Sequence, residues 1–172
     1  MLKGGQIYLR TLEPSDADII WKWENNSDNW RVSNTLVPFS RKLIEDYVNS
    51  AQDIYSIKQL RFIICLLEND KEIGAIDLFD FDPYHHKVGV GILIAELQDR
   101  RNGYAKEAVL LIKEYCFNHL NLHQVYCNIL SKNKASIDLF EKSGFTICGT
   151  KKDWIKNKEG WLDELMLQSF SV

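Results

Sequence analysis

One stretch of the sequence joins an apolar run, a basic turn and the start of a helix. The run from Val90 to Ala95 predicts a buried strand, and Arg100, Arg101 and Gly103 follow it in a short polar turn. Beyond the turn, small and apolar residues recur at helical spacing. The N–H groups at a helix N-terminus lack partners within the helix and carry the positive end of its dipole. With two arginines beside them, they predict an anion site that suits a phosphate group.

A mixed α/β (α+β) architecture is predicted to position this turn. Apolar periodicity and turn residues indicate seven strands and about four helices in the order β-α-α-β-β-β-α-β-α-β-β. The expected strands are 6–11, 60–67, 72–81, 87–95, 124–130, 145–152 and 161–170, and the expected helices are 14–24, 40–51, 104–116 and 133–142. The long helix before the strand at 124–130 requires one parallel crossover in a mostly antiparallel sheet. Residues 25–39 are expected to form a binding loop.

Length and composition limit the classes of protein. The chain has 172 residues, of which 45% are hydrophobic and 26% charged, and a net charge of -3. These values predict one globular domain over residues 1–172 and do not favour a nucleic-acid partner. No apolar stretch is long enough for a membrane span, and the N-terminus does not resemble a signal peptide. The four cysteines stand singly in apolar segments, which predicts buried free thiols, a cytoplasmic location and no metal site.

Two motifs carry a resemblance to a known family. The segment Arg100-Arg101-Asn102-Gly103-Tyr104-Ala105 resembles the Q/R-x-x-G-x-G/A pyrophosphate loop of the GNAT N-acetyltransferases. The segment 133–145, with Asn133, Ser136, Phe140 and Gly144, is similar to the second signature of that superfamily. The order of elements matches across nearly the whole chain. The branch that it resembles holds the ribosomal-protein N-terminal acetyltransferases and the spermidine/diamine acetyltransferases, so a GNAT-like acyl-CoA N-acyltransferase fold is expected.

The resemblance implies transfer of the acetyl group of acetyl-CoA to a primary amine by direct attack in a ternary complex. It implies that the pantetheine arm pairs with the backbone of the strand at 92–94, where a bulge separates this strand from the next one. An N–H group freed there would stabilise the oxyanion. The implied CoA-binding residues are Ile92, Leu93, Ile94, Arg100, Arg101, Asn102, Gly103, Tyr104, Ala105, Asn133, Ser136 and Phe140.

The catalytic acid and base depart from the family pattern. Many relatives have a tyrosine at the position of Phe140 that protonates the leaving thiolate, a role that phenylalanine cannot perform. Ser136 or a water molecule is then expected to protonate the sulfur. Asn128 stands where some N-terminal acetyltransferases have a glutamate base. Asp77 and Asp80 are the nearest carboxylates, and since they lie three residues apart only one can enter the cleft. Asp77 is the candidate for catalysis.

The acceptor is expected to bind between the early helices and the last hairpin. Carboxylates beside aromatic rings in these regions suit a cationic amine. The candidate residues for acceptor binding are Glu24, Asp28, Trp30, Asp80 and Trp154. A protein N-terminus and a small amine both fit, and a spermidine/diamine acetyltransferase is an alternative. A non-catalytic regulatory module that binds acetyl-CoA is an alternative of another class. The resembling branch also implies a homodimer.

Overall fold

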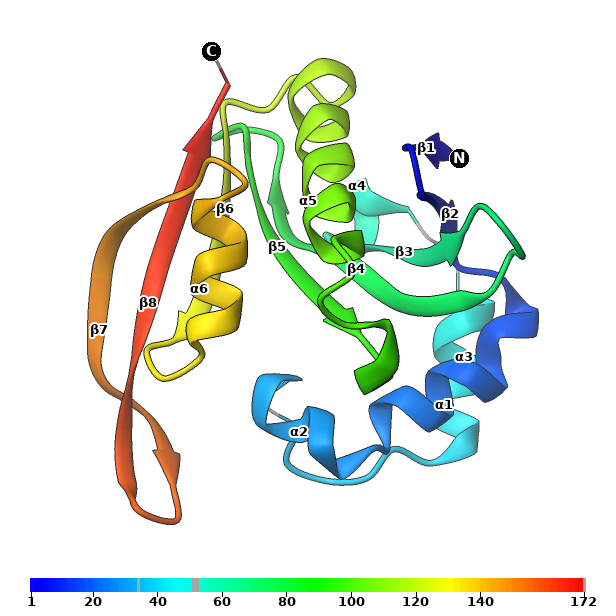
Figure 1. The fold of residues 1–172 in the computed structure, drawn as a ribbon, viewed down its shortest axis with the longest axis horizontal. Coiled ribbons are helices and arrows are strands. Elements are labelled where there is room, and N and C mark those ends of the chain that lie inside the picture. The colour runs from blue at the N-terminus through cyan, green and yellow to red at the C-terminus, as the bar shows by residue number, and fades with distance from the viewer. Residues whose placement is uncertain (34, 51–52, 172) are drawn as a thin grey trace.

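The sheet contains eight strands rather than the seven predicted (Figure 1). The computed structural model describes residues 1–33, 35–50 and 53–171, and over these the strand order is β1-β2-β3-β4-β5-β6-β8-β7. The strands are β1 (Leu2–Lys3), β2 (Ile7–Thr11), β3 (Leu60–Leu66), β4 (Glu72–Asp82), β5 (Lys87–Ile94), β6 (Gln124–Leu130), β7 (Thr146–Asn157) and β8 (Gly160–Phe170). β5 and β6 run parallel and the other neighbours antiparallel, as predicted. The additional strand β1 has two residues, too few to show a period in the sequence.

Helices flank both faces of this sheet. They are α1 (Ala17–Glu24), α2 (Ser27–Ser33), α3 (Arg41–Asn49), α4 (Ile54–Ile57), α5 (Tyr104–Glu114) and α6 (Lys134–Glu141). The four predicted helices are present as α1, α3, α5 and α6, whereas α2 and α4 were not predicted. The prediction of a loop over 25–39 is wrong at α2, which begins where the Asn26 side chain accepts a hydrogen bond from the Asp28 N–H group. Residues 34 and 51, which belong to the predicted loop and helix, lie outside the described residues.

Two hydrophobic cores form, one on each face of the sheet. α5 and α6 cover the first face, where Ile64 of β3 packs in one cluster with Ile112 of α5. α1 and α3 cover the second face, where Ile63 of β3 packs in another cluster with Ile20 of α1. Successive residues of a strand point to opposite faces, so Ile63 and Ile64 enter different cores. This burial on both sides explains the continuous apolar run of β3.

β5 and β6 separate partway along β5. Their pairing joins Lys87–Gly89 to Gln124–Tyr126, and the following residues Val90–Ile94 pair with β4 on the other side. Figure 1 shows the two ribbons diverging toward the end of the molecule where α2 lies. One edge of the Val90–Ile94 backbone is therefore free of strand pairing in the described part of the chain.

The bulge expected at 92–94 lies in a different strand. The register between β4 and β5 is regular from Gly74 to Phe79 and shifts between Phe79 and Asp82. Asp80, inside this irregular segment, has a φ of 50°. A residue in the left-handed region does not continue a regular ladder, and aspartate adopts that region more readily than most residues. The irregularity is thus in β4, close to the point where β5 leaves β6.

Candidate active site

Two adjoining cavities occupy the region where β5 leaves β6. The first, of about 440 Å³, lies between the separated strands and is called the split cavity here. The second, of about 630 Å³, lies against residues 97–106 and is called the loop cavity. Four residues line both of them: Ile92, Leu93, Asn133 and Ser136. A long ligand held in the loop cavity can therefore extend directly into the split cavity.

The loop cavity presents backbone donors at the start of α5. Gly103 is the N-cap of this helix and has a φ of 87°, a left-handed conformation that favours glycine. The N–H group of Glu107 bonds to the Gly103 carbonyl at 3.1 Å, whereas the N–H groups of residues 101–106 donate to no other described residue. Such free donors at a helix N-terminus favour an anionic ligand, and this geometry agrees with the anion site that the sequence predicts.

The two arginines of the loop differ in their surroundings. The guanidinium of Arg100 donates to the carbonyls of Ile94 and Ala95 at 3.0 and 3.2 Å and to the Asn29 side chain at 3.1 Å. Arg101 is exposed and lines the loop cavity together with Lys106. Arg100 therefore fixes the end of β5 against α2, while Arg101 and Lys106 are the cations available to an anionic ligand. The role of Lys106 was not predicted, although its place on the first turn of the helix is visible in the sequence.

Other predicted CoA-binding residues divide between the cavity and the core. Ile94 and Ala105 line the loop cavity. Asn102 and Tyr104 do not line it: the Asn102 amide donates to the Gln98 carbonyl at 3.1 Å, and the Tyr104 side chain packs against the core. These two side chains are therefore engaged within the protein rather than on the cavity wall.

Asn133 and Ser136 stand at the start of α6, between the two cavities. The side-chain oxygen of Asn133 accepts a hydrogen bond from the Ser136 N–H group at 3.2 Å, which makes Asn133 the N-cap. The Ser136 hydroxyl itself bonds to none of the described residues. It is thus free to interact with a ligand that passes from one cavity into the other.

Phe140 lines the split cavity one helical turn after Ser136. Its side chain is buried and packs edge-to-face against Phe145, with ring centroids 5.0 Å apart. The position lies where a proton donor would face the cavity, but a phenyl ring has no proton to give. Of the four residues that line both cavities, Ser136 is the one that carries a hydroxyl group.

A charged cluster forms one wall of the split cavity. Arg61 of β3 donates to both oxygens of Asp77, at 2.6 and 3.0 Å, and to Glu24 of α1 at 2.7 Å. Its guanidinium lies over the Tyr47 ring, 5.5 Å from the centroid. Burial works against the charge of Arg61, but attraction by Asp77 and Glu24 outweighs it and raises the pKa of the guanidinium. Two carboxylates and one permanent cation leave this wall with a net negative charge.

A third carboxylate lies on the opposite wall. Glu164 of β8 lines the split cavity and is buried, with 8% of the residue exposed. Lys151 of β7 donates to Glu164 at 2.8 Å and to the Asn128 side chain at 3.1 Å. Neither Glu164 nor Arg61 was predicted as a site residue. Consecutive acidic residues in a hairpin strand resemble a solvated edge, and only the pairing of β8 with β6 brings Glu164 into the cavity.

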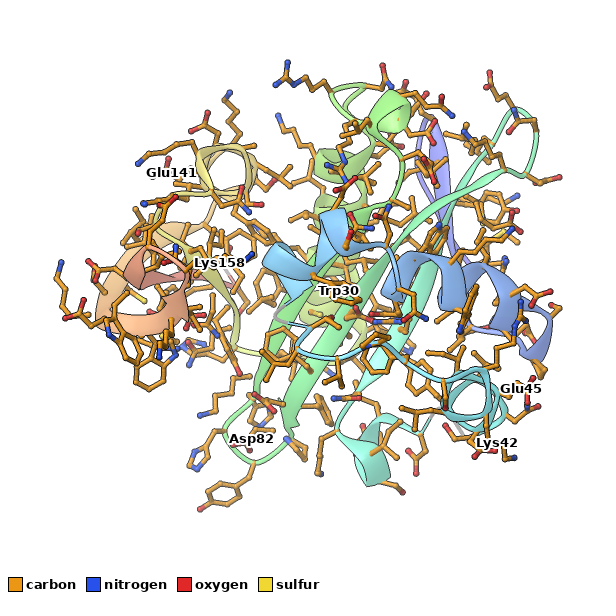
Figure 2. The ribbon with its side chains drawn as sticks, turned by 90° about the horizontal axis from the view of Figure 1, so that it is seen from below. Trp30, Lys42, Glu45, Asp82, Glu141 and Lys158 are labelled. Carbon is orange, nitrogen blue, oxygen red and sulfur yellow. The ribbon has the colours of Figure 1, made fainter. Side chains whose placement is uncertain are left out.

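Of the five predicted acceptor-binding residues, Glu24 lines the split cavity and the other four lie outside it. Asp28 is exposed on α2, and the indole N–H of Trp30 donates to the Glu24 carbonyl at 2.8 Å (Figure 2). Asp80 is exposed and accepts a hydrogen bond from the Tyr126 hydroxyl at 3.3 Å. Trp154 is 56% exposed and lies under Lys151. As predicted, only one of Asp77 and Asp80 enters the cavity, and that one is Asp77.

The fold and the paired cavities define an acyltransferase of the acyl-CoA-binding type. The chain belongs to the GNAT family, since the family model described as an acetyltransferase (GNAT) domain matches residues 6–146. It is 27% identical over 176 residues to the probable N-acetyltransferase YjcK of Bacillus subtilis, which covers 97% of this chain and 95% of that protein. It is 25% identical over 142 residues to the spermidine N(1)-acetyltransferase of Vibrio cholerae, covering 81% and 79% of the two chains.

Solved structures show the same fold. The crystal structure of the Vibrio cholerae spermidine N-acetyltransferase in complex with CoA and spermine matches with a TM-score of 0.87 at 22% identity, over 97% of this chain and 96% of that one. A GNAT-family acetyltransferase from Bacillus anthracis matches with a TM-score of 0.82 at 21% identity, over 98% and 97% of the two chains. The prediction of a GNAT fold is confirmed.

This protein is an N-acetyltransferase that transfers the acetyl group of acetyl-CoA to an amine, as predicted. Within the described part of the chain, no helix is long and apolar enough to cross a membrane. The same residues contain no group of three or more histidine, cysteine, aspartate or glutamate side chains arranged to hold a metal ion.

Proposed function

We propose that acetyl-CoA binds in the loop cavity and that a cationic primary amine binds in the split cavity. The observation that carries this proposal is the border of Ile92, Leu93, Asn133 and Ser136 that the two cavities share. The diphosphate would bind to the free N–H groups at the start of α5, with Arg101 as its charge partner. The pantetheine arm would follow the unpaired edge of β5, so that the thioester reaches the shared border.

The charges of the split cavity support a cationic acceptor. Its walls carry the carboxylates of Glu24, Asp77 and Glu164, and the cations Arg61 and Lys151 pair with them. Three negative charges against two positive ones leave a net charge of -1 for this group. A cavity of one sign between low-dielectric walls raises the local concentration of the opposite ion. We infer that Glu24 and Asp77 attract the ammonium group of the acceptor.

We propose that the amine attacks the thioester directly and that no acetyl-cysteine intermediate forms. Cys127 lines the split cavity, but burial raises the pKa of its thiol to about 12. The thiolate is the nucleophilic form of cysteine, and it is scarce at neutral pH when the pKa is that high. The amine nitrogen would therefore attack the thioester carbon itself, and Ser136 would donate a proton to the departing sulfur.

The acceptor is proposed to be a small amine or a protein N-terminus. A polyamine is the alternative acceptor, because some relatives are named spermidine N(1)-acetyltransferases. To distinguish them, purified protein is mixed with acetyl-CoA and with spermidine, putrescine, lysine or a short peptide, and free CoA thiol is followed in time. Faster release with one of these amines supports the proposal. Tight CoA binding without release for any amine would indicate a regulatory acetyl-CoA-binding module instead.

We further propose that residues 1–172 act as one domain in a cytoplasmic homodimer. β7 is an edge strand, and Trp154 and Trp161 of the β7–β8 hairpin are 56% and 57% exposed. An edge strand with exposed aromatic residues supports pairing with a second copy. Light scattering after gel filtration should give twice the mass of the chain, and a monomer at micromolar concentration would contradict the proposal.

A further inference from the structure

The register of the sheet places one carboxylate on each side of the separation of β5 and β6. Asp77 of β4 lies opposite Gly91 of β5, on one side. Glu164 of β8 lies opposite Leu130 of β6, on the other side. Each is thus one strand away from the separation, and both line the split cavity. A substrate that enters between the strands has a carboxylate on either side.

Glu164 is also close to the end of the cavity where Ser136 lies. The N–H group of Ser131 donates to the carbonyl of Asp163 at 3.0 Å, which ties β8 to the chain just before the N-cap of α6. Asn133 is that N-cap, and Ser136 is bonded to it. These hydrogen bonds therefore connect the part of β8 that carries Glu164 to the start of α6 that carries Ser136.

The carboxylates differ in how many of their oxygens are occupied. Both oxygens of Asp77 accept hydrogen bonds from Arg61. In Glu164, Oε2 accepts a hydrogen bond from Lys151 at 2.8 Å, and Oε1 accepts none from the residues that the structure describes. A base must offer a free lone pair to the proton that it removes. Glu24 also has one oxygen that accepts no hydrogen bond from the described residues. Its other oxygen is bonded to Arg61 of β3, and β3 is one strand further from the separation than β4.

We propose that Glu164 is the general base of the acetyl transfer and that Lys151 positions it. This inference rests on the proposed binding of the acceptor amine in the split cavity. Oε1 of Glu164 takes a proton from the ammonium group, and the freed nitrogen lone pair attacks the thioester carbon. As the C–S bond breaks, the CoA thiolate takes a proton from Ser136 or water, and the second proton that the nitrogen loses on forming the amide replaces it. The proton on Glu164 passes to solvent. The acetylated amine and free CoA are the products.

The charged surroundings of Glu164 keep it available for this role. Lys151 faces it from β7, while the adjacent residues of β6 on this side, Asn128 and Leu130, carry no charge. The other titratable groups that line the cavity are Glu24, Arg61, Asp77 and Cys127. The ammonium of Lys151 holds the carboxylate through a charge-assisted hydrogen bond. The contact to Asn128 fixes Nζ, so Oε2 is held and Oε1 is left for the substrate.

The test is the variant Glu164→Gln, which keeps the shape of the side chain but cannot accept a proton. With the amine of the panel that the wild type acetylates fastest, kcat should fall roughly a hundredfold or more. The KM for acetyl-CoA should stay the same. The acid limb of the profile, where kcat declines toward low pH, should move to higher pH, because the variant depends on amine already uncharged in solution. With hydroxylamine, which is mostly uncharged at neutral pH, the loss should be much smaller.

Two variants serve as controls. Asp163→Asn changes the adjacent residue, which pairs with Lys152 outside the split cavity, and should leave kcat unchanged. Asp77→Asn should raise the KM for the amine more than it lowers kcat. Should Glu164→Gln keep the wild-type kcat and pH profile, or should Asp77→Asn move the acid limb instead, Glu164 is not the base. If the wild type acetylates no amine, the proposed function fails, which is a separate result.

A further variant covers the case in which Glu164→Gln does not fold. Lys151→Gln removes the cation but keeps a hydrogen-bond donor. It should move the acid limb of the kcat profile, because the positive charge beside the proposed base is removed. An unchanged limb would overturn the proposal.

Discussion

Arg61 and Asp77 form a two-pronged ion pair on the wall of the split cavity, with Nε–Oδ1 and Nη2–Oδ2 distances of 2.6 and 3.0 Å. The same guanidinium reaches Glu24 of α1, so a single cation connects the first helix to β3 and β4. The pair lies in a partly buried site where water compensates poorly for a missing partner. It therefore shapes the acceptor site and also stabilises the fold.

Replacement of Arg61 by methionine is predicted to destabilise the protein by about 3–5 kcal/mol, because Glu24 and Asp77 would remain without a cation. Urea denaturation at neutral pH measures this change in the free energy of unfolding. Asp46→Asn is the matched control, since it breaks the pair with Lys42 in which both side chains are more than half exposed. That change should leave the free energy of unfolding close to the wild-type value, because water screens an exposed pair. Equal losses in the two variants would show that the Arg61 cluster is no stronger than a surface pair.

Replacement of the two loop arginines is predicted to affect two different properties, CoA binding and thermal stability. Arg101→Met should weaken CoA binding roughly tenfold, the value of one lost charge-assisted hydrogen bond, without a change in the melting temperature. Arg100→Met should lower the melting temperature, because the carbonyls of Ile94 and Ala95 lose their donor. Calorimetric titration with CoA and thermal unfolding separate the two effects. If Arg101→Met melts early and Arg100→Met does not, the assignment of the two roles is reversed.

Asn133 and Ser136 provide a second pair of contrasting variants. The cap of α6 uses the Asn133 side chain and the backbone N–H of Ser136, so Ser136→Ala should not weaken the helix. Asn133→Ala should cost about 1 kcal/mol of stability. Ser136→Ala is instead predicted to lower kcat by roughly tenfold or more, because the leaving sulfur loses its proton donor.

Addition of Phe140→Tyr to Ser136→Ala should restore part of the lost rate, since a phenol would then face the split cavity. Steady-state thiol release at saturating acetyl-CoA measures both variants. A kcat for Ser136→Ala equal to that of the wild type would assign the proton to water.

The sequence was sufficient for the features that depend on local pattern. The strand at 87–94, the glycine before α5 and the Asn133 cap follow from apolar runs and from residues that favour particular backbone conformations. The residues of the charged walls could not be found in this way. Arg61 forms an ion pair with Glu24, which lies 37 residues earlier in the sequence. Glu164 lines the cavity because β8 pairs with β6, where Glu164 lies opposite Leu130. Such contacts depend on tertiary packing, and the same residues in another fold would be exposed to solvent.

The expectation of four buried cysteines was wrong for one of them, and the difference leads to a pH prediction. Cys65, Cys116 and Cys127 are buried, whereas Cys148 lies on the outer part of β7 and is exposed. Burial raises the pKa of the Cys116 and Cys127 thiols from about 9 to about 12. In the unfolded chain these thiols ionise near pH 9, so the unfolded state releases protons that the folded state keeps.

The free energy of unfolding should therefore keep its full value below about pH 9, the pKa of the thiols in the unfolded chain. It should fall as pH rises from about 9 to about 12, the pKa in the folded protein. Each thiol contributes a slope of up to about 1.4 kcal/mol per pH unit. Urea unfolding across this range should give a shallower decline for Cys116→Ala, even though that variant starts from a lower stability. Cys148→Ala is the control and should decline as steeply as the wild type, because this side chain is exposed in the folded protein. A Cys116→Ala profile parallel to the wild type would mean that the buried thiol ionises without unfolding.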